Sequence, residues 1–289
     1  MQRKREPFCR AYTLIELSIV VLVLALLAGA AMRYANAINE AKTSRDANAT
    51  LDIVETALQN YRNMYGRLPC PSDLTVAESA AGFGTEVGTA GDGNCSGANY
   101  TNSTTDPDAS GGSDPGAPDT NYDSATASKV VFGGVPTRTL RLADRYAYDS
   151  WGRKIFYAVD KRITATSAFT TYSISNSVVG AVVVKKTGTD TLANALTYKA
   201  LYALVTTGKN GHGGYARNVS GTQARVNAGS VNADQLVNCH CTSAAVAASF
   251  TRIFVQKPKT MDYSTSNDDF DDIVRYKRRS DMATTAELQ

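Results

Sequence analysis

One apolar run dominates the first part of the chain. From Leu17 to Met32 the sequence contains no charged residue, and an α-helix of that length is about 24 Å long. One acid, Glu16, precedes the run and is itself flanked by apolar residues. Adding these flanking residues brings the helix close to the roughly 30 Å of a bilayer core. The pattern therefore predicts a transmembrane segment over about 12–34.

The helical pattern continues beyond this run. No proline or glycine occurs from Arg33 to Tyr65, and Gly66 and Pro69 then supply stop signals. An apolar stripe recurs at helical spacing, at Leu51, Val54, Leu58, Tyr61 and Tyr65. We expect one long helix over 12–66. Its first half is apolar all round, and its amphipathic second half needs a domain to pack against.

The composition changes after the helix. From Leu68 to Ser128 there is no lysine or arginine, and Gly, Ser, Thr, Asp and Asn are abundant. Such a segment cannot bury much apolar surface. We expect an acidic surface loop or partly disordered insertion over 67–128.

Short runs typical of β-strands follow from Lys129 onward, most of them separated by turn residues. The candidates are Lys129–Phe132, Lys154–Val159, Val178–Lys185, Leu201–Thr206, Thr251–Gln256 and Ile273–Lys277. Short helices are expected over 227–238 and 243–249. The predicted fold class is α+β, in which a long N-terminal helix with a membrane-spanning first half packs against an antiparallel β-sheet domain over 129–289.

The net charge of +3 comes from the first eleven residues. They contain four basic residues and one acid, namely Arg3, Lys4, Arg5, Arg10 and Glu6. Basic residues beside an apolar span favour the cytoplasmic side. If this leader is removed, the remaining chain has no net charge, which argues against nucleic acid as the default partner.

Glu16 separates three interpretations of the N-terminal segment. A carboxylate inside an apolar membrane segment costs several kcal/mol and indicates a function. A secretory signal is supported by Ala28-Gly29-Ala30, but the apolar run is long for one and contains an acid. A plain membrane anchor leaves the acid unexplained. The third interpretation is a leader that is cleaved while the apolar helix is retained.

The residues around the acid favour the third interpretation. The basic leader, 1–11, ends in the small residue Ala11, and Tyr12 precedes the run Thr-Leu-Ile-Glu-Leu over 13–17. This segment resembles the N-terminus of type IV prepilins, in which Gly and Phe usually occupy the positions of Ala11 and Tyr12. The resemblance implies cleavage by prepilin peptidase between Ala11 and Tyr12, and N-methylation of Tyr12.

The same resemblance implies a role in assembly for Glu16. In pilin-like filaments this carboxylate meets the terminal amine of a neighbouring subunit, an ion pair that offsets the cost of burial. The residues that share this motif are Thr13, Leu14, Ile15 and Leu17.

Four later stretches are similar to the pseudopilins of type II secretion, particularly the major one. They are the Tyr-rich helix end over 61–69, the turn over 149–152, the glycine-rich loop over 206–214 and the acidic lead over 271–276. Within the turn, Trp151 and Gly152 are expected to be structural, with Trp151 as a half-buried packing residue.

The glycine-rich loop resembles one that holds calcium in the major pseudopilin. Calcium prefers several oxygen ligands, including carboxylates. The candidate ligands are Asn210, which stands where an acid is usual, together with Asp268, Asp269 and Asp271. The alternatives are a structural glycine turn and a solvated acidic run. No other cofactor is expected.

The five cysteines leave several pairings open. Cys9 lies in the leader, and the other four are Cys70, Cys95, Cys239 and Cys241. An even number favours disulfides in an oxidising compartment, but four cysteines allow three pairings. A metal site formed by Cys239, His240 and Cys241 with His212 matches no common zinc spacing.

Neither catalysis nor DNA binding is favoured. The sequence has no nucleophile elbow, Walker motif or zincin motif, and it contains only two histidines. A C-terminal basic cluster with one aromatic residue discriminates poorly for nucleic acid. We therefore expect a protein that is not an enzyme and does not bind nucleic acid.

Together these features predict a structural subunit of a type IV filament machine, specifically a minor pseudopilin of a type II secretion system. A minor type IV pilin for adhesion, motility or DNA uptake is the alternative. The expected partners are the inner membrane, prepilin peptidase, other pilin-like subunits and an inner-membrane assembly platform. The expected location is the bacterial inner membrane, with a cytoplasmic N-terminus, a single span and a periplasmic domain that later enters the filament.

Overall fold

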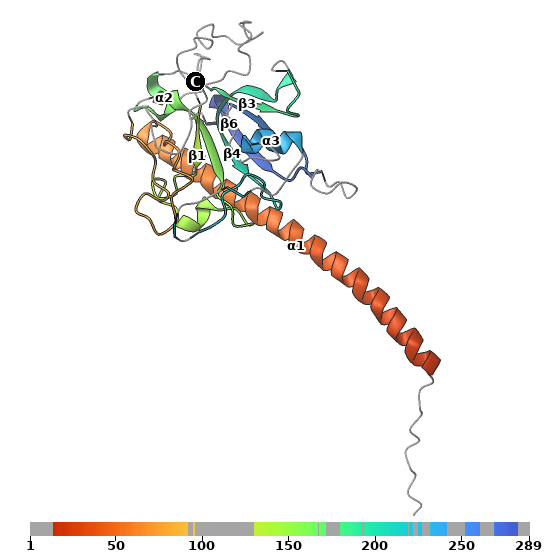
Figure 1. The fold of residues 1–289 in the computed structure, drawn as a ribbon. Helices are drawn as coiled ribbons and strands as arrows, with labels where there is room; N and C mark the ends of the chain where they lie inside the picture. Colours follow the sequence, from red (N-terminus) through yellow and green to blue (C-terminus); the bar gives the residue numbers. More distant parts are fainter. Residues whose placement is uncertain are drawn as a thin grey trace, which may run out of the picture. The chain divides into compact units, whose positions relative to one another are not determined.

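Figure 1 shows the computed structural model of the chain. The chain divides into two compact units, Met1–Arg45 and Asp46–Gln289. The structure describes residues 14–91, 95, 130–166, 168–171, 180–191, 194–218, 220–221, 225–226, 232–241, 252–260 and 269–282. The predicted processing residues Ala11 and Tyr12 therefore lie outside the described residues, as do Thr13 of the predicted assembly motif and the predicted helix over 243–249.

Helix α1 covers Leu14–Tyr65, a single helix of 52 residues. Glu16 lies in its first turn and Arg62 in its last turn, the ends at which the helix dipole favours each charge. Gly66 terminates the helix in a left-handed conformation with φ of 63°, and its N–H donates to the carbonyl of Arg62 at 2.8 Å. The sequence signal for the end of the helix is confirmed.

The transmembrane prediction is wrong. Of the helices in the described ranges, none is both long enough and apolar enough to cross a membrane. The charge-free run is bounded by Glu16 and Arg33, so its helical length of about 24 Å falls short of the roughly 30 Å required. This finding overturns the predicted membrane-spanning first half of the helix and the predicted single-pass inner-membrane location.

Six strands form one sheet. They are β1 (Val130–Gly134), β2 (Phe156–Asp160), β3 (Val182–Lys185), β4 (Thr197–Thr206), β5 (Ile253–Val255) and β6 (Ile273–Arg278). The remaining elements are η2 (Asp144–Ala147), η3 (Lys161–Thr164), α2 (Ala168–Thr171), α3 (Ala233–Cys239) and α4 (Arg279–Met282). Each strand overlaps one of the six predicted runs, with shifted ends, and α3 overlaps the short helix predicted over 227–238.

The sheet is mixed, which corrects the predicted antiparallel sheet. The strand order is β1-β2-β4-β3-β5, and β6 pairs with β4. All these pairs are antiparallel except β3 with β5, which is parallel. The strand β5 is also attached to α3, whose Asn238 accepts from Val255 N–H at 2.7 Å and donates to Val255 O at 3.0 Å. The predicted fold class is therefore wrong in its sheet type as well as in its membrane span.

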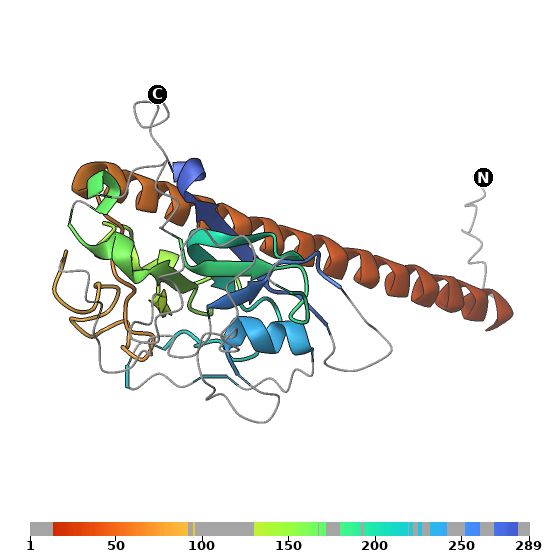
Figure 2. The same cartoon turned by 90° about the horizontal axis from the view of Figure 1, so that it is seen from above.

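Alternating residues of the strands contribute their side chains to two hydrophobic layers. In β2, Tyr157 and Val159 belong to the layer that contains Leu51, Val54, Leu58 and Tyr61 of α1. Phe156 and Ala158 face the layer that contains Cys239 and Cys241 at the end of α3. The helix from residue 46 onward therefore covers one face of the sheet and α3 the other (Figure 2).

Residues 67–91 are more tightly packed than their composition predicts. Leu68, Leu74 and Phe83 are at most 2% exposed although they lie outside helices and strands. Backbone bonds join this segment to the sheet, as where Ser72 and Gly134 exchange two hydrogen bonds of 2.8 Å. The segment 67–91 contains no helix or strand, as expected of a loop, but part of it is packed against the sheet; 92–94 and 96–128 lie outside the described residues.

Candidate functional site

The first half of α1 presents apolar side chains to solvent. The exposed fraction is 86% for Leu14, 68% for Ile15 and 60% for Leu17, and Glu16 beside them is also exposed. Further exposed apolar residues in this half are Ile19, Val20, Val21, Leu22, Val23, Leu24, Leu26, Leu27 and Met32. A contiguous apolar surface of this kind marks a site of interaction. The structure thus places the described part of the predicted assembly motif on one exposed helical segment.

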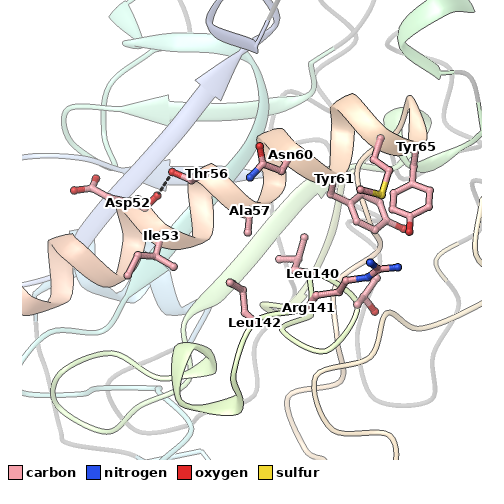
Figure 3. Close-up of a pocket in the computed structure, with 12 residues that line it drawn as sticks. Asp52, Ile53, Thr56, Ala57, Asn60, Tyr61, Tyr65, Leu140, Arg141 and Leu142 are labelled. Carbon is pink, nitrogen blue, oxygen red and sulfur yellow. Dashed lines mark hydrogen bonds between the residues drawn. The ribbon is translucent and has the colours of Figure 1, made fainter.

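A groove of about 470 Å³ runs beside the second half of α1 (Figure 3). Its helical wall includes Ile53, Ala57 and Met64, and its other wall includes Leu140 and Leu142. The side chains of Ile53 and Met64 are 38% and 67% exposed. The groove is therefore a second apolar surface, and it belongs to the folded domain.

The glycine-rich loop and the acidic segment meet, as the calcium hypothesis requires. The N–H of Asn210 donates to Asp271 Oδ2 at 2.9 Å, and its side-chain amide donates to Gln235 Oε1 at 2.8 Å. Gln235 in turn donates to Asp271 Oδ1 at 2.6 Å. Both carboxylate oxygens of Asp271 therefore already accept hydrogen bonds, and a cation at this position would have to displace amide donors. Of the other candidate ligands, Asp269 is described but Asp268 is not.

Two further acids lie close to this segment. Burial raises the pKa of Asp272 well above its usual value and also raises that of Asp271. Burial raises the pKa of Asp149 to about 6, although hydrogen bonds from the N–H groups of Arg153 and Trp151, both 2.9 Å long, favour its charged form. Asp149 Oδ2 is buried and has no hydrogen-bond partner within the described residues. Burial at these three positions therefore favours the protonated, neutral form of the carboxyl group.

The turn that contains Trp151 is held by its own residues. Asp149 caps it by accepting two N–H bonds, and Gly152 adopts a left-handed φ of 77°. Three residues separate the turn from β2, and the structural role expected of Trp151 and Gly152 stays a prediction.

The cysteines pair with their neighbours in sequence, one of the three pairings left open. Cys70 bonds to Cys95 and Cys239 to Cys241, across sequence separations of 25 and 2. Loop-closure entropy assigns about 3.5 kcal/mol of stabilisation to the first bridge but only about 1.2 kcal/mol to the second. The first bridge is therefore the structural one.

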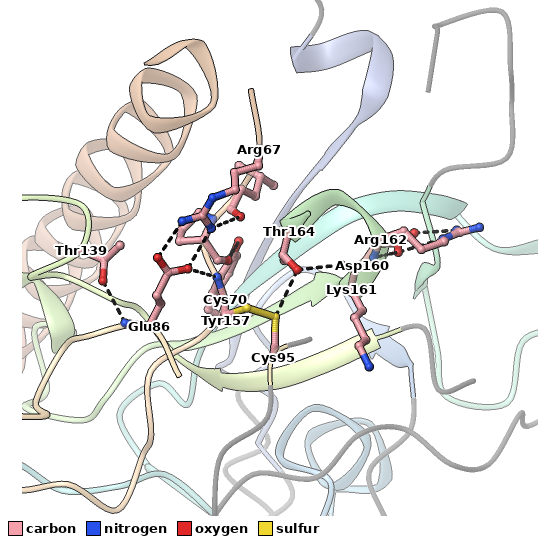
Figure 4. Close-up of a disulfide and its surroundings, with 12 residues drawn as sticks. Arg67, Cys70, Glu86, Cys95, Thr139, Tyr157, Asp160, Lys161, Arg162 and Thr164 are labelled. Atoms are coloured by element: carbon pink, nitrogen blue, oxygen red, sulfur yellow. Dashed lines mark hydrogen bonds and ion pairs between the residues drawn. A yellow bond between two sulfur atoms is a disulfide. The ribbon is translucent and has the colours of Figure 1, made fainter. Parts of the chain in front are cut away.

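The Cys70–Cys95 bridge lies beside a buried ion pair (Figure 4). Arg67 donates to both carboxylate oxygens of Glu86, at 2.8 and 2.9 Å, and the N–H of Cys70 donates to Glu86 at 3.0 Å. Burial opposes ionisation of Glu86, but these hydrogen bonds outweigh it and hold the pKa of Glu86 below its usual value. Tyr61 of α1 also donates to Glu86, at 3.2 Å, which ties the helix end to this cluster.

Sequence reasoning missed Glu86, Gln235 and Asp272. Glu86 lies in a segment that its composition marked as a solvated loop, and Gln235 lies in a short helix with no distinctive motif. Only the acidic pair at 271–272 carried a signal, because it belongs to the acidic lead before β6 that the resemblance singled out. Comparison of this chain with protein-family models, curated proteins and solved structures gives no match.

Proposed function

We propose that this chain is a subunit of a type IV filament-family assembly, and that its specific role is that of a minor pseudopilin in type II secretion. The observation that carries the proposal is the exposed apolar half of α1, with Glu16 in its first turn. Burying apolar surface contributes about 25 cal/mol per Å², so packing this half against the same helix of neighbouring subunits favours association. The partners proposed are other pilin-like subunits, prepilin peptidase and an assembly platform.

Glu16 supplies specificity to this packing. A carboxylate buried between helices needs a positive partner, and cleavage before Tyr12 would create a free α-amino group in the adjacent subunit. The pair would set the axial offset between neighbouring helices. Apolar packing alone would tolerate several offsets.

Glu16→Leu tests the role of the acid. The processed wild-type chain is expected to enter filaments with its partner subunits, and Glu16→Leu is expected to lower incorporation at least about tenfold. Incorporation is measured by immunoblotting of sheared filaments against the cell-associated fraction. Asp46→Leu is the matched control, because Asp46 is an exposed acid of the same helix beyond the apolar run, and it is expected to keep normal incorporation. Equal incorporation of wild type and Glu16→Leu would contradict the proposal.

A gene deletion separates the two machines. Loss of exoprotein release with normal twitching and transformation supports the pseudopilin role. The reverse pattern supports a minor type IV pilin.

A further inference from the structure

The end of α3 forms a compact Cys-His-Cys turn on the face of the sheet opposite α1. Cys239 is the last residue of the helix, and His240 follows in a left-handed conformation with φ and ψ of 50°. The N–H of Cys241 then donates to the carbonyl of Leu236 at 3.2 Å. This reversal brings the two sulfur atoms to the same side, where they are joined as a disulfide.

A histidine from the glycine-rich loop lies against these two cysteines. One ligand atom from each of His212, Cys239 and Cys241 lies within 4.8 Å of the other two. The three residues are 2%, 1% and 6% exposed. Gly213 makes this approach feasible, because a Cβ at its position would lie 2.6 Å from Cys239 Cβ. The chain is therefore built to hold His212 beside the cysteine pair.

The surroundings suit thiolate ligands. Arg225 donates to the carbonyl of Cys239 at 2.8 Å, and a nearby guanidinium favours the thiolate form of a cysteine. The ring of His240 has a different role, since it packs edge-on against Phe132 and Phe254 with centroid distances of 5.2 and 5.1 Å. His212 is thus the imidazole that lies beside the two sulfurs.

We propose that Cys239, Cys241 and His212 form a redox-gated binding site for one d¹⁰ cation of the Zn²⁺ class. Two sulfurs and one imidazole nitrogen are ligands that such ions take in tetrahedral sites, with a fourth position left for water. Ligand atoms around such an ion lie roughly 3.5 Å apart, so after reduction the two sulfurs must separate and the imidazole must move towards them. This site is independent of the proposed function of α1.

The disulfide and the metal exclude each other. A dithiol reductant supplies two electrons and two protons, which converts the Cys239–Cys241 bond into two thiols while the reductant becomes a disulfide. The cation then displaces both thiol protons to water as it binds. Because this bridge closes a loop of only one intervening residue, it gains less from loop closure than Cys70–Cys95 does and is the more easily reduced of the two.

Cobalt binding to the full chain tests the site. The protein is reduced, freed of reductant under anaerobic conditions and titrated with Co²⁺, whose thiolate complexes absorb in the near ultraviolet and visible. We expect one equivalent bound by the reduced chain, none by the oxidised chain, and displacement of Co²⁺ by Zn²⁺. Cys239→Ser with Cys241→Ser should abolish these bands, and His212→Asn should weaken binding by about tenfold or more.

Alkylation of the wild-type chain provides a readout that does not depend on variant folding. Zn²⁺ should protect Cys239 and Cys241 of the reduced chain from iodoacetamide and leave the extent of alkylation of Cys70 and Cys95 unchanged. The proposal is overturned if the reduced chain, with its thiols confirmed by titration, gives no cobalt bands. It is equally overturned if binding persists at full affinity in the double serine variant or in His212→Asn, or if protection falls on Cys70 and Cys95.

Discussion

The two halves of α1 share apolar character but differ in what covers them. In the first half the large apolar side chains are exposed, from 46% at Val23 to 86% at Leu14. In the second half Leu51, Val54 and Leu58 are fully buried against the sheet. Helical periodicity alone thus does not decide whether an apolar residue is buried or exposed. The second half packs against the sheet of the same chain, and under our proposal the first half packs against other subunits.

The largest effect expected from this comparison is a difference between two leucine-to-alanine substitutions. Leu58→Ala removes a fully buried side chain and should lower the free energy of unfolding by between about 2 and 5 kcal/mol. Leu22→Ala removes a side chain that is 62% exposed and should change it by less than about 0.5 kcal/mol. Denaturant unfolding followed by Trp151 fluorescence measures both. An equal loss in the two variants would mean that the first half contributes to the folded domain.

A smaller effect is expected where the end of α1 meets the buried ion pair. Glu86→Gln keeps the shape but removes the charge opposite Arg67, and at pH 7 it should cost about 2 kcal/mol of stability. Because the pKa of Glu86 is lowered in the folded state, its stabilising contribution is present above its unfolded pKa of about 4.3 and is lost as the pH falls through the folded value.

The pH dependence of this stability difference separates the effect of the Glu86 charge from that of packing. The difference in unfolding free energy between wild type and Glu86→Gln should shrink as the pH falls below the unfolded pKa of about 4.3. It should be smallest below the lowered pKa of folded Glu86, where both proteins carry a neutral side chain at this position. Other buried acids such as Asp149 and Asp272 titrate in both proteins and cancel in the difference. A difference that stays constant down to acidic pH would show that packing, not charge, is responsible.

The smallest effect is expected at the surface of the same helix. Arg275 of β6 contacts Asp52 at 3.3 Å and Asn48 at 3.0 Å, and the Asp52 side chain is 63% exposed. Arg275→Ala should therefore change the unfolding free energy by less than about 1 kcal/mol, with little further change in high salt. Thermal unfolding at two salt concentrations measures it. A loss comparable to that of Leu58→Ala would show that the polar border, and not the apolar stripe, holds the second half of α1 in place.

Local sequence signals predicted the elements better than their arrangement. Gly66 and the apolar runs located the end of α1 and all six strands, because these depend on backbone preference and short-range spacing. The parallel placement of β5 was not predictable in this way, since it involves contacts between segments far apart in the sequence, such as β3 with β5. The burial of 67–91 was missed for a similar reason. The composition of a segment does not reveal that one of its acids, Glu86, pairs with Arg67.

The candidate site was predictable only in part. The motif around Glu16 and the encounter of Asn210 with Asp271 followed from residues that a resemblance singled out. The cluster of His212 with Cys239 and Cys241 follows no standard ligand spacing. It arises because a left-handed turn and a glycine bring two distant segments together, and such a contact is visible only in three dimensions.

The position of β6 has a consequence for the order of events during synthesis. Residues 202–205 of β4 are flanked by β2 on one edge and by β6 on the other, so the centre of the sheet is completed by a late segment. The contact between Arg275 and Asn48 spans 227 residues of sequence. The helix α1 is therefore synthesised long before β6, the strand that completes the sheet on which the second half of α1 packs. We expect the nascent chain to depend on chaperones throughout that interval, and truncation before β6 to yield aggregates rather than a smaller folded domain.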